Sequence, residues 1–211
     1  MCIRDRYYAW SSMVHYRESG ESSSFIIPTG NMGNSFACFI AREMGFPIQK
    51  VLFATNSNRT IYNFAKTGEW IPSSSIPTFA SAMDVGNPSN MERFFSLYND
   101  DKKLSREMDC ISVNDEEIIE QIELQFRKSN LVICPHTATA FKAYESLDEK
   151  EKNYHHWVIV STAHPAKFEN IVEPIIKESI DVPTNLMTIL EKESSFTVID
   201  SDFTSLKQFL V

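Results

Sequence analysis

The segment Phe25–Asn34, with the sequence FIIPTGNMGN, constrains the fold of this chain more than any other. Its apolar residues predict a buried strand that ends at Pro28, and an apolar segment with helical periodicity begins at Gly33. A strand, a glycine-rich turn and a helix in this order form an anion site in α/β proteins, because glycines let the backbone approach the anion and N–H groups at the helix start point towards it. The turn matches neither the dinucleotide nor the nucleoside triphosphate glycine pattern. We therefore expect it to bind the phosphate of another kind of ligand.

The neighbouring segments predict a parallel α/β sheet. Val51–Thr55 is a continuous apolar run, which is typical of a strand buried on both faces. Helices are expected over 33–44 and 59–66, and Leu131–Cys134 and Trp157–Val160 are predicted as two further buried strands. Short links between alternating helices and strands favour an α/β layer with parallel strands.

The rest of the chain contains more helix signals, separated by a long loop. Helices are predicted over 91–98, 101–108, 115–128 and 135–146, and 70–88 is predicted to be an irregular loop. The aromatic segment Tyr7–Tyr16 predicts a helix whose apolar face holds Trp10, Met13 and Val14. Residues 167–211 alternate short helix and strand signals that give no clear order.

Composition argues against several classes of partner. The 211 residues carry a formal net charge of −8, whereas a surface for nucleic acid or an anionic membrane needs a basic face. No apolar run approaches the ~18 residues of a membrane span. The four cysteines form no CxxC pair and have no histidine at metal-ligand spacing, so we expect no metal site and a reducing, cytoplasmic compartment; they are Cys2, Cys38, Cys110 and Cys134.

Three polar turns follow apolar strands, and ligands of parallel sheets bind at the carboxyl ends of strands. The turns are PTGNMGN, ATNSN and STAHP. Thr162, in the third turn, could cap a helix or form a hydrogen bond with a ring nitrogen of a cofactor. His136 and His164 are expected to be capping or core histidines, and His155-His156 is expected to lie in a solvated loop. Lys66 is expected in the last turn of a helix, where a cation is favoured.

Five sequence blocks resemble the threonine synthase family, whose members are fold-type II enzymes that use pyridoxal phosphate. The blocks are PTGNMGN, ATNSNRTIYNFAKTGEW, SAMDVGNPSNMERF, CPHTATAF and STAHPAKF, and they follow the family's order from Phe25 to about Phe168. The resemblance implies a three-layer α/β fold with a mostly parallel sheet, similar to the β subunit of tryptophan synthase. It also implies conversion of O-phospho-L-homoserine and water into L-threonine and phosphate, as part of threonine biosynthesis in the cytoplasm.

The resemblance also implies roles for individual residues. The phosphate of pyridoxal phosphate would lie against Gly30, Asn31, Met32, Gly33 and Asn34. Thr162 would bind the ring nitrogen; a neutral hydroxyl does not hold that nitrogen protonated as a carboxylate would, which favours elimination and replacement over transamination. Met32 stands where the family usually has Phe. Asn56, Asn58, Ser81 and Asp84 are substrate-binding candidates by position only, and Ser81 replaces a proline of the family pattern.

One family feature has no counterpart in the sequence. The family's Schiff-base lysine lies in a block before the phosphate turn, and no matching block is found here. We therefore interpret 7–211 as the C-terminal part of the catalytic region, without its N-terminal domain, and 1–6 (MCIRDR) as a non-native leader. The chain alone is predicted to be inactive. A threonine synthase-like phospho-lyase and a non-catalytic module that keeps the fold are the alternatives, and the sequence does not decide between a monomer and a homodimer.

Overall fold

The computed structural model describes residues 3–210, which form two compact units. The first unit reaches to Ile180 and the second begins at Asp181. The first unit contains α1 (Asp5–Ser19), β1 (Ser23–Pro28), α2 (Gly33–Glu43), β2 (Ile48–Thr55), α3 (Thr60–Thr67), η1 (Ser81–Met83), α4 (Met91–Tyr98), α5 (Asp101–Glu107), β3 (Asp109–Ser112), α6 (Asp115–Ser129), α7 (Pro135–Glu145), α8 (Glu149–Tyr154), β4 (His156–Ile159), η2 (Pro165–Phe168) and α9 (Glu169–Ile176).

The four strands form one parallel sheet in the order β3-β2-β1-β4. β1 is central: Ile26 is paired with Leu52 of β2 on one side and with Ile159 of β4 on the other. Every residue of β1 is buried, which explains its continuous apolar sequence. The predicted parallel α/β architecture is confirmed.

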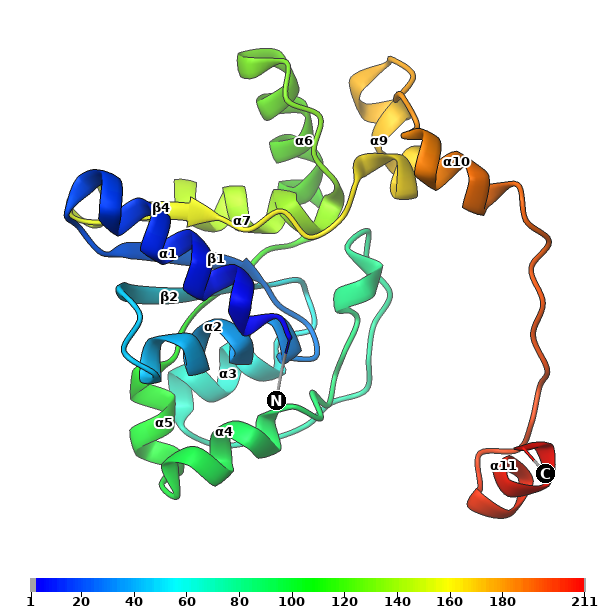
Figure 1. Ribbon diagram of the computed structural model, residues 1–211, viewed down its shortest axis with the longest axis horizontal. Coiled ribbons are helices and arrows are strands. Elements are labelled where there is room, and N and C mark those ends of the chain that lie inside the picture. The colour runs from blue at the N-terminus through cyan, green and yellow to red at the C-terminus, as the bar shows by residue number, and fades with distance from the viewer. Residues whose placement is uncertain (1–2, 211) are drawn as a thin grey trace. The chain divides into compact units, whose positions relative to one another are not determined.

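Helices cover both faces of the sheet and make three layers (Figure 1). On one face, Phe25 and Phe53 pack with Phe94 of α4 and with apolar residues of α2 and α3. On the other face, Ile26 and Leu52 pack against Ala140 of α7. Successive side chains of a strand point to opposite faces, so two neighbouring residues of β1 contribute to two different cores.

Local sequence signals account for several helix boundaries. Asn114 and Glu117 form a reciprocal capping box at the start of α6, and Asp100 caps α5 through two backbone N–H groups. α4 spans the predicted residues. Helix α1 confirms the predicted N-terminal helix, but its buried face holds Asp5, Tyr8 and Ser12, whereas the side chain of Trp10 is 70% exposed.

The structure contradicts the prediction of a strand over Leu131–Cys134. This segment has no strand pairing and connects α6 to α7, where Cys134 caps α7 and Ile133 joins the core. The run is apolar because of that core contact. A strand that the sequence analysis missed, β3, lies at the sheet edge and has the mixed sequence DCIS. The predicted strand over Trp157–Val160 is found as β4, but it is a half-buried edge strand.

The second unit contains two helices, α10 (Thr184–Leu190) and α11 (Phe203–Leu210). Residues 167–210 form helices and loops without a strand, so the strand signals in this part of the sequence have no counterpart. Within residues 3–210, no helix combines the length and the apolar composition needed to cross a membrane.

Candidate functional site

A cavity of about 1170 Å³ lies at the carboxyl ends of the two adjacent strands β1 and β4. The turn after β1, the turn after β4, helix α1, η1 and the first turn of α7 form its wall. The residues that line it are Arg4, Arg6, Tyr7, Tyr8, Trp10, Ser11, Phe25, Pro28, Thr29, Gly30, Asn31, Met32, Gly33, Asn34, Ser35, Ala82, Met83, His136, Val158, Val160, Ser161 and Thr162. The predicted phosphate turn and Thr162 therefore share one cavity.

The turn between β1 and α2 is fixed by two short-range contacts. The hydroxyl of Thr29 donates a hydrogen bond to the carbonyl of Ile27 at 2.8 Å and forms a close hydrogen bond with the hydroxyl of Ser35. Gly30 is packed against η1: a Cβ at this position would lie 2.6 Å from Cα of Met83. Because Met83 Cα is a backbone atom, no rotation of its side chain could relieve that clash. Position 30 therefore requires glycine.

Helix α2 directs its N-terminus to this cavity. Met32 precedes the helix with a left-handed backbone (φ 63°), although its side chain is buried, and Gly33 is the first helical residue. The first N–H groups of a helix have no acceptor within the helix and, with the helix dipole, attract an anion. A guanidinium nitrogen of Arg4 would lie 3.2 Å from a Cβ on Gly33, so a cation stands beside the helix start.

The amide of Asn31 is oriented by the segment before α4. Its Oδ1 accepts hydrogen bonds from the backbone N–H of Ser89 at 2.7 Å and from the hydroxyl of Ser89 at 3.1 Å. A backbone N–H can only donate, so the amide oxygen faces Ser89 and the NH₂ group is the other branch of the side chain. Asn34 is held in the same way, because its Oδ1 accepts from the hydroxyl of Tyr8 at 2.9 Å. Both side chains keep amide donors in the cavity wall.

The charges around the cavity favour an anionic ligand. Arg4 and Arg6 line it, and no aspartate or glutamate is found among the lining residues of the described chain. Arg4 and Arg6 belong to the segment predicted to be non-native.

Two hydroxyl groups lie on the cavity wall after β4. Thr162 is exposed to the cavity, and Ser161 contacts the hydroxyl of Thr137 on α7 at 3.3 Å. The apolar residues Val158 and Val160 lie just before them on the same wall. This arrangement of an apolar surface that ends in hydroxyls suits a flat ring with a polar atom at its edge.

His136 is buried, as expected for a core histidine, and it also lines the cavity. Its side chain is 3% exposed, and Nε2 accepts a hydrogen bond from the N–H of Ala82 at 3.0 Å. Nδ1 is buried without a hydrogen-bond partner among the described residues. Burial lowers the pKa of His136, and the nearby charge of Asp84 opposes this effect only in part. The ring is therefore neutral at pH 7.

The turn after β2 does not line this cavity. Asn56 and Asn58 are buried and donate hydrogen bonds to the carboxylate of Asp84 at 2.7 and 3.2 Å. Asp84 also accepts from the N–H and the hydroxyl of Thr78. These contacts tie the loop that carries η1 to the end of β2. Of the four substrate-binding candidates, three thus form one buried network behind η1, and Ser81 is exposed at the start of η1 without lining the cavity.

The remaining predicted polar residues lie outside the cavity. His164 caps η2 by accepting the N–H of Ala166, as expected. Lys66 is in the last turn of α3. Cys38, Cys110 and Cys134 are free and buried, and burial raises the pKa of the Cys110 thiol to about 12; Cys2 lies outside the described residues.

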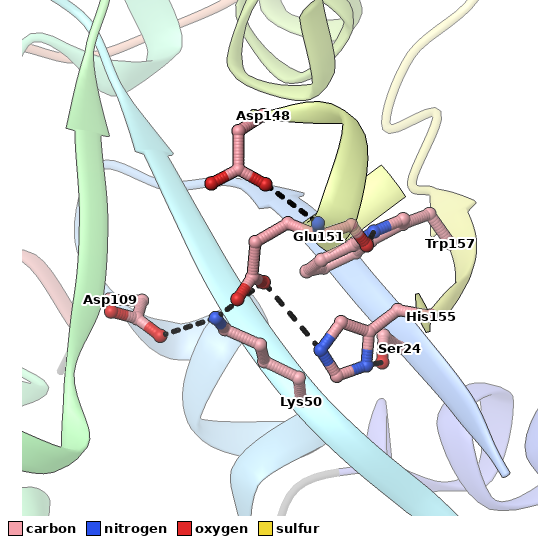
Figure 2. Close-up of polar contacts among 7 residues, drawn as sticks. All are labelled: Ser24, Lys50, Asp109, Asp148, Glu151, His155 and Trp157. Atoms are coloured by element: carbon pink, nitrogen blue, oxygen red, sulfur yellow. Dashed lines mark hydrogen bonds and ion pairs between the residues drawn. The ribbon is translucent and has the colours of Figure 1, made fainter. Parts of the chain in front are cut away.

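The prediction of a solvated loop at His155-His156 is wrong for His155. Its side chain is 8% exposed and lies between the hydroxyl of Ser24, at 3.2 Å from Nδ1, and the carboxylate of Glu151, at 3.5 Å from Nε2 (Figure 2). Glu151 is only four residues away, but Ser24 is 131 residues away, so the local sequence does not show that the ring is packed against β1. His156 begins β4, and its side chain is half exposed.

Comparison with known proteins agrees with this site. Residues 12–163 match the family model described as pyridoxal-phosphate dependent enzyme, and residues 137–210 match the model described as threonine synthase, C-terminal. The chain belongs to the pyridoxal-phosphate dependent enzyme family. Within that family it is similar to threonine synthases: it is 33% identical over 205 residues to the enzyme of Buchnera aphidicola from Schizaphis graminum, with 97% of this chain and 47% of the relative aligned.

Solved structures give the same result. The threonine synthase of Escherichia coli is 28% identical, with a TM-score of 0.77 over 89% of this chain and 43% of that one. The threonine synthases of yeast and of Brucella melitensis have TM-scores of 0.82 and 0.80 at 23% and 24% identity, which shows the shared fold. The chain spans about half the length of the curated relatives it matches.

The cavity fits the cofactor of this family. A helix N-terminus, fixed amides and an absence of carboxylates among the described lining residues suit its phosphate, and the hydroxyl of Thr162 stands where a ring nitrogen could be bound. Gly30 lets η1 close against the phosphate turn without blocking it. The residues present therefore fit pyridoxal phosphate.

Proposed function

We propose that this chain forms the cofactor-binding part of a cytoplasmic threonine synthase, which converts O-phospho-L-homoserine and water into L-threonine and phosphate. The observation that carries the proposal is the meeting of the phosphate turn and Thr162 in one cavity. The resemblance of the whole described sequence to threonine synthases supports the choice among pyridoxal phosphate enzymes.

In this proposal the turn residues bind and orient the cofactor phosphate. The N-terminus of α2 supplies N–H donors, and the amides of Asn31 and Asn34 add neutral donors whose orientation is set by Ser89 and Tyr8. Met32 contributes through its backbone, since its side chain is buried in the core. Amide donors and the positive end of the helix dipole favour the ionised form of the phosphate.

Thr162 then binds the ring nitrogen, at the end of the ligand away from the phosphate. A hydroxyl can donate to an unprotonated ring nitrogen, and it carries no charge that would draw a proton to that nitrogen. When bound, pyridoxal phosphate supplies an electron sink for substrate carbanions. Val158 and Val160, which line the same wall, would keep water from one face of the bound ring.

Binding of the cofactor is the first test. We expect the purified 211-residue chain to bind pyridoxal phosphate more tightly than pyridoxal in isothermal titration calorimetry, because the phosphate contacts dominate. Asn31→Ala should lower the affinity for pyridoxal phosphate about tenfold and hardly change the affinity for pyridoxal. Equal affinity for the two ligands would contradict the proposed orientation.

The reaction is the second test. Residues 1–211 contain no counterpart of the family's Schiff-base lysine block, so we expect no phosphate release from O-phospho-L-homoserine by this chain alone. Addition of a separately expressed polypeptide with the lysine block of the Escherichia coli enzyme should yield threonine and phosphate in equal amounts. Formation of 2-oxobutyrate in place of threonine would favour a phospho-lyase, and turnover by the chain alone would refute the assigned need for that block.

A further inference from the structure

The imidazole of His136 connects helix α7 to η1 at the wall of the cavity. Its Nε2 lies 3.0 Å from the backbone nitrogen of Ala82, and both residues line the cavity. His136 is in the first turn of α7, and the ring of Phe168 packs against it at a centroid distance of 4.7 Å. The ring is thus held in one orientation.

This contact defines the tautomer of the ring. A backbone N–H can only donate, so Nε2 of His136 must be the acceptor and the proton of the neutral ring lies on Nδ1. That Nδ1–H is buried and has no partner among residues 3–210. An unsatisfied buried donor is unfavourable, and the contact to Ala82 is made in spite of it.

The contact extends to the phosphate turn. Ala82 is the middle residue of η1, and Met83, the next residue, packs its backbone directly against Gly30. Asp84 and Asn56 hold the end of the same loop from the side of β2. η1 is therefore fixed between two supports, and His136 is the support on the cavity side.

We propose that His136 is a positioning residue for the bound phosphate ligand: its unprotonated Nε2 holds η1 against the phosphate turn, and protonation of the ring releases η1. The proposal rests on the proposed function, because it assigns the cavity to pyridoxal phosphate. A protonated ring has donors at both nitrogens and would place an N–H against the N–H of Ala82. Ligand affinity should therefore fall when the ring gains a proton.

The surrounding charges act on this protonation in opposite directions. Asp84, which follows η1, favours the protonated ring, whereas burial and the position in the first turn of α7 disfavour it. Arg4 and Arg6 are the other charged groups that line the same cavity. Phe168 of η2 covers the ring with an uncharged surface.

The other elements that pack on α7 direct their charges elsewhere. On α6, Glu117 and Glu120 pair with Lys142, which lies on a later turn of α7. In the sheet, Lys50 of β2 and Asp109 of β3 pair with each other at the amino-terminal edge. On β4, His156 pairs with Glu21.

Two variants separate the two nitrogens. His136→Gln places an amide oxygen near the position of Nε2, and His136→Asn reaches only the position of Nδ1. We expect His136→Gln to bind pyridoxal phosphate within about twofold of wild type at pH 7.5, and His136→Asn and His136→Leu to bind about tenfold more weakly in calorimetry. In parallel, the amide of Ala82 should exchange its hydrogen about tenfold faster in His136→Asn and His136→Leu only.

The pH profile distinguishes positioning from packing. Between pH 7.5 and 5.0, wild-type affinity should fall more than that of His136→Gln, which does not titrate; the ionisation of the ligand phosphate near pH ~6 affects both proteins alike. Wild-type affinity in His136→Leu, or weak binding by His136→Gln together with strong binding by His136→Asn, would overturn the proposal. Failure of the wild-type chain to bind pyridoxal phosphate would refute the proposed function, whereas unchanged exchange at Ala82 in His136→Leu would refute the positioning contact itself.

Discussion

The two edges of the sheet carry similar polar residues but use them differently. At the amino-terminal edge, the ammonium of Lys50 lies 2.9 Å from the carboxylate of Glu151 and 3.2 Å from that of Asp109, and both nitrogens of His155 have partners (Figure 2). Strands β1, β2 and β3 and helix α8 are joined by this one cluster. At the carboxyl-terminal edge, amides, hydroxyls and a histidine line the cavity. Nδ1 of this histidine, His136, has no hydrogen-bond partner among the described residues.

The two buried histidines make the comparison specific. Burial lowers the pKa of both His136 and His155, against the opposing charges of Asp84 and Glu151. His155 lies in a serine–histidine–glutamate row, yet Ser24 is fully buried, so no substrate can reach it. A row of catalytic residue types is therefore weaker support for a site than polar residues that line a cavity. Four substitutions test this difference between the edges.

The largest effect is expected for Gly30→Ala at the cavity edge. The added Cβ would meet the backbone of Met83 at 2.6 Å, so η1 must move away from the phosphate turn. We expect a stability loss of about 1–3 kcal/mol and an affinity for pyridoxal phosphate about 100-fold lower. Gly20→Ala is the control: Gly20 does not line the cavity and has open space around its Cβ position, so affinity should not change. Normal binding by Gly30→Ala would show that the contact between η1 and the phosphate turn is not needed for binding.

Glu151→Gln tests the amino-terminal edge. The change removes the charge partner of Lys50 and the carboxylate beside His155, and since these side chains are only partly exposed, we expect a loss of about 1–2 kcal/mol in urea unfolding. Affinity for pyridoxal phosphate should stay at the wild-type value. Glu149→Gln, in an exposed pair with Lys152, should cost less than about 0.5 kcal/mol. A parallel loss of affinity in Glu151→Gln would mean that the two edges are coupled.

Thr162→Val should lower the affinity for pyridoxal phosphate about fivefold, because the hydroxyl that could bind the ring nitrogen is lost. Stability should stay unchanged, because a methyl group of similar size replaces this hydroxyl on the cavity wall. Thr162→Ser keeps the hydroxyl and should bind as the wild type does. If both variants bind normally, the ring nitrogen has another partner.

The smallest effect is expected from pH at His155. Its pKa is lowered in the folded chain, so its contribution to stability is present above the unfolded value of about 6.5 and is lost as pH falls through the folded value. His155→Gln should therefore lose less stability than wild type between pH 7.5 and 5.0 in thermal unfolding. If the stability of the two proteins falls equally with pH, burial does not lower the pKa of His155 as assigned here.

Lys50 behaves in the opposite sense. Burial alone would lower the pKa of its ammonium, but Glu151 and Asp109 together raise it. Its contribution is therefore present at neutral pH and is lost only at alkaline pH, outside the range of that experiment.

The sequence predicts what depends on short-range pattern. The apolar runs at Phe25–Ile27 and Val51–Thr55, the cap at Asn114 and the glycine turn each contain their own physical cause. The turn and Thr162 were placed at one edge because parallel strands end together, and the structure agrees. The turn with Asn56 and Asn58 does not line the cavity: β2 is separated from β4 by β1, and this turn supports η1. Their contact with substrate stays a prediction.

What the sequence missed depends on contacts between distant residues. His136 meets Ala82, 54 positions away, and His155 meets Ser24, 131 positions away. Neither contact has a periodic signal. Leu131–Cys134 shows the converse: four apolar residues predict a strand, but Cys134 serves as a helix cap and Ile133 fills the core. Burial alone does not distinguish a strand from a connecting segment.

The close packing of Gly30 against Met83 has a consequence for genetics. Two of the three atoms nearest to the position of a Cβ on Gly30 are backbone atoms of Met83, which every residue type carries. A change of side chain at position 83 therefore cannot restore a Gly30→Ala variant. Second-site revertants should instead alter the length or path of the loop between Trp70 and Pro88.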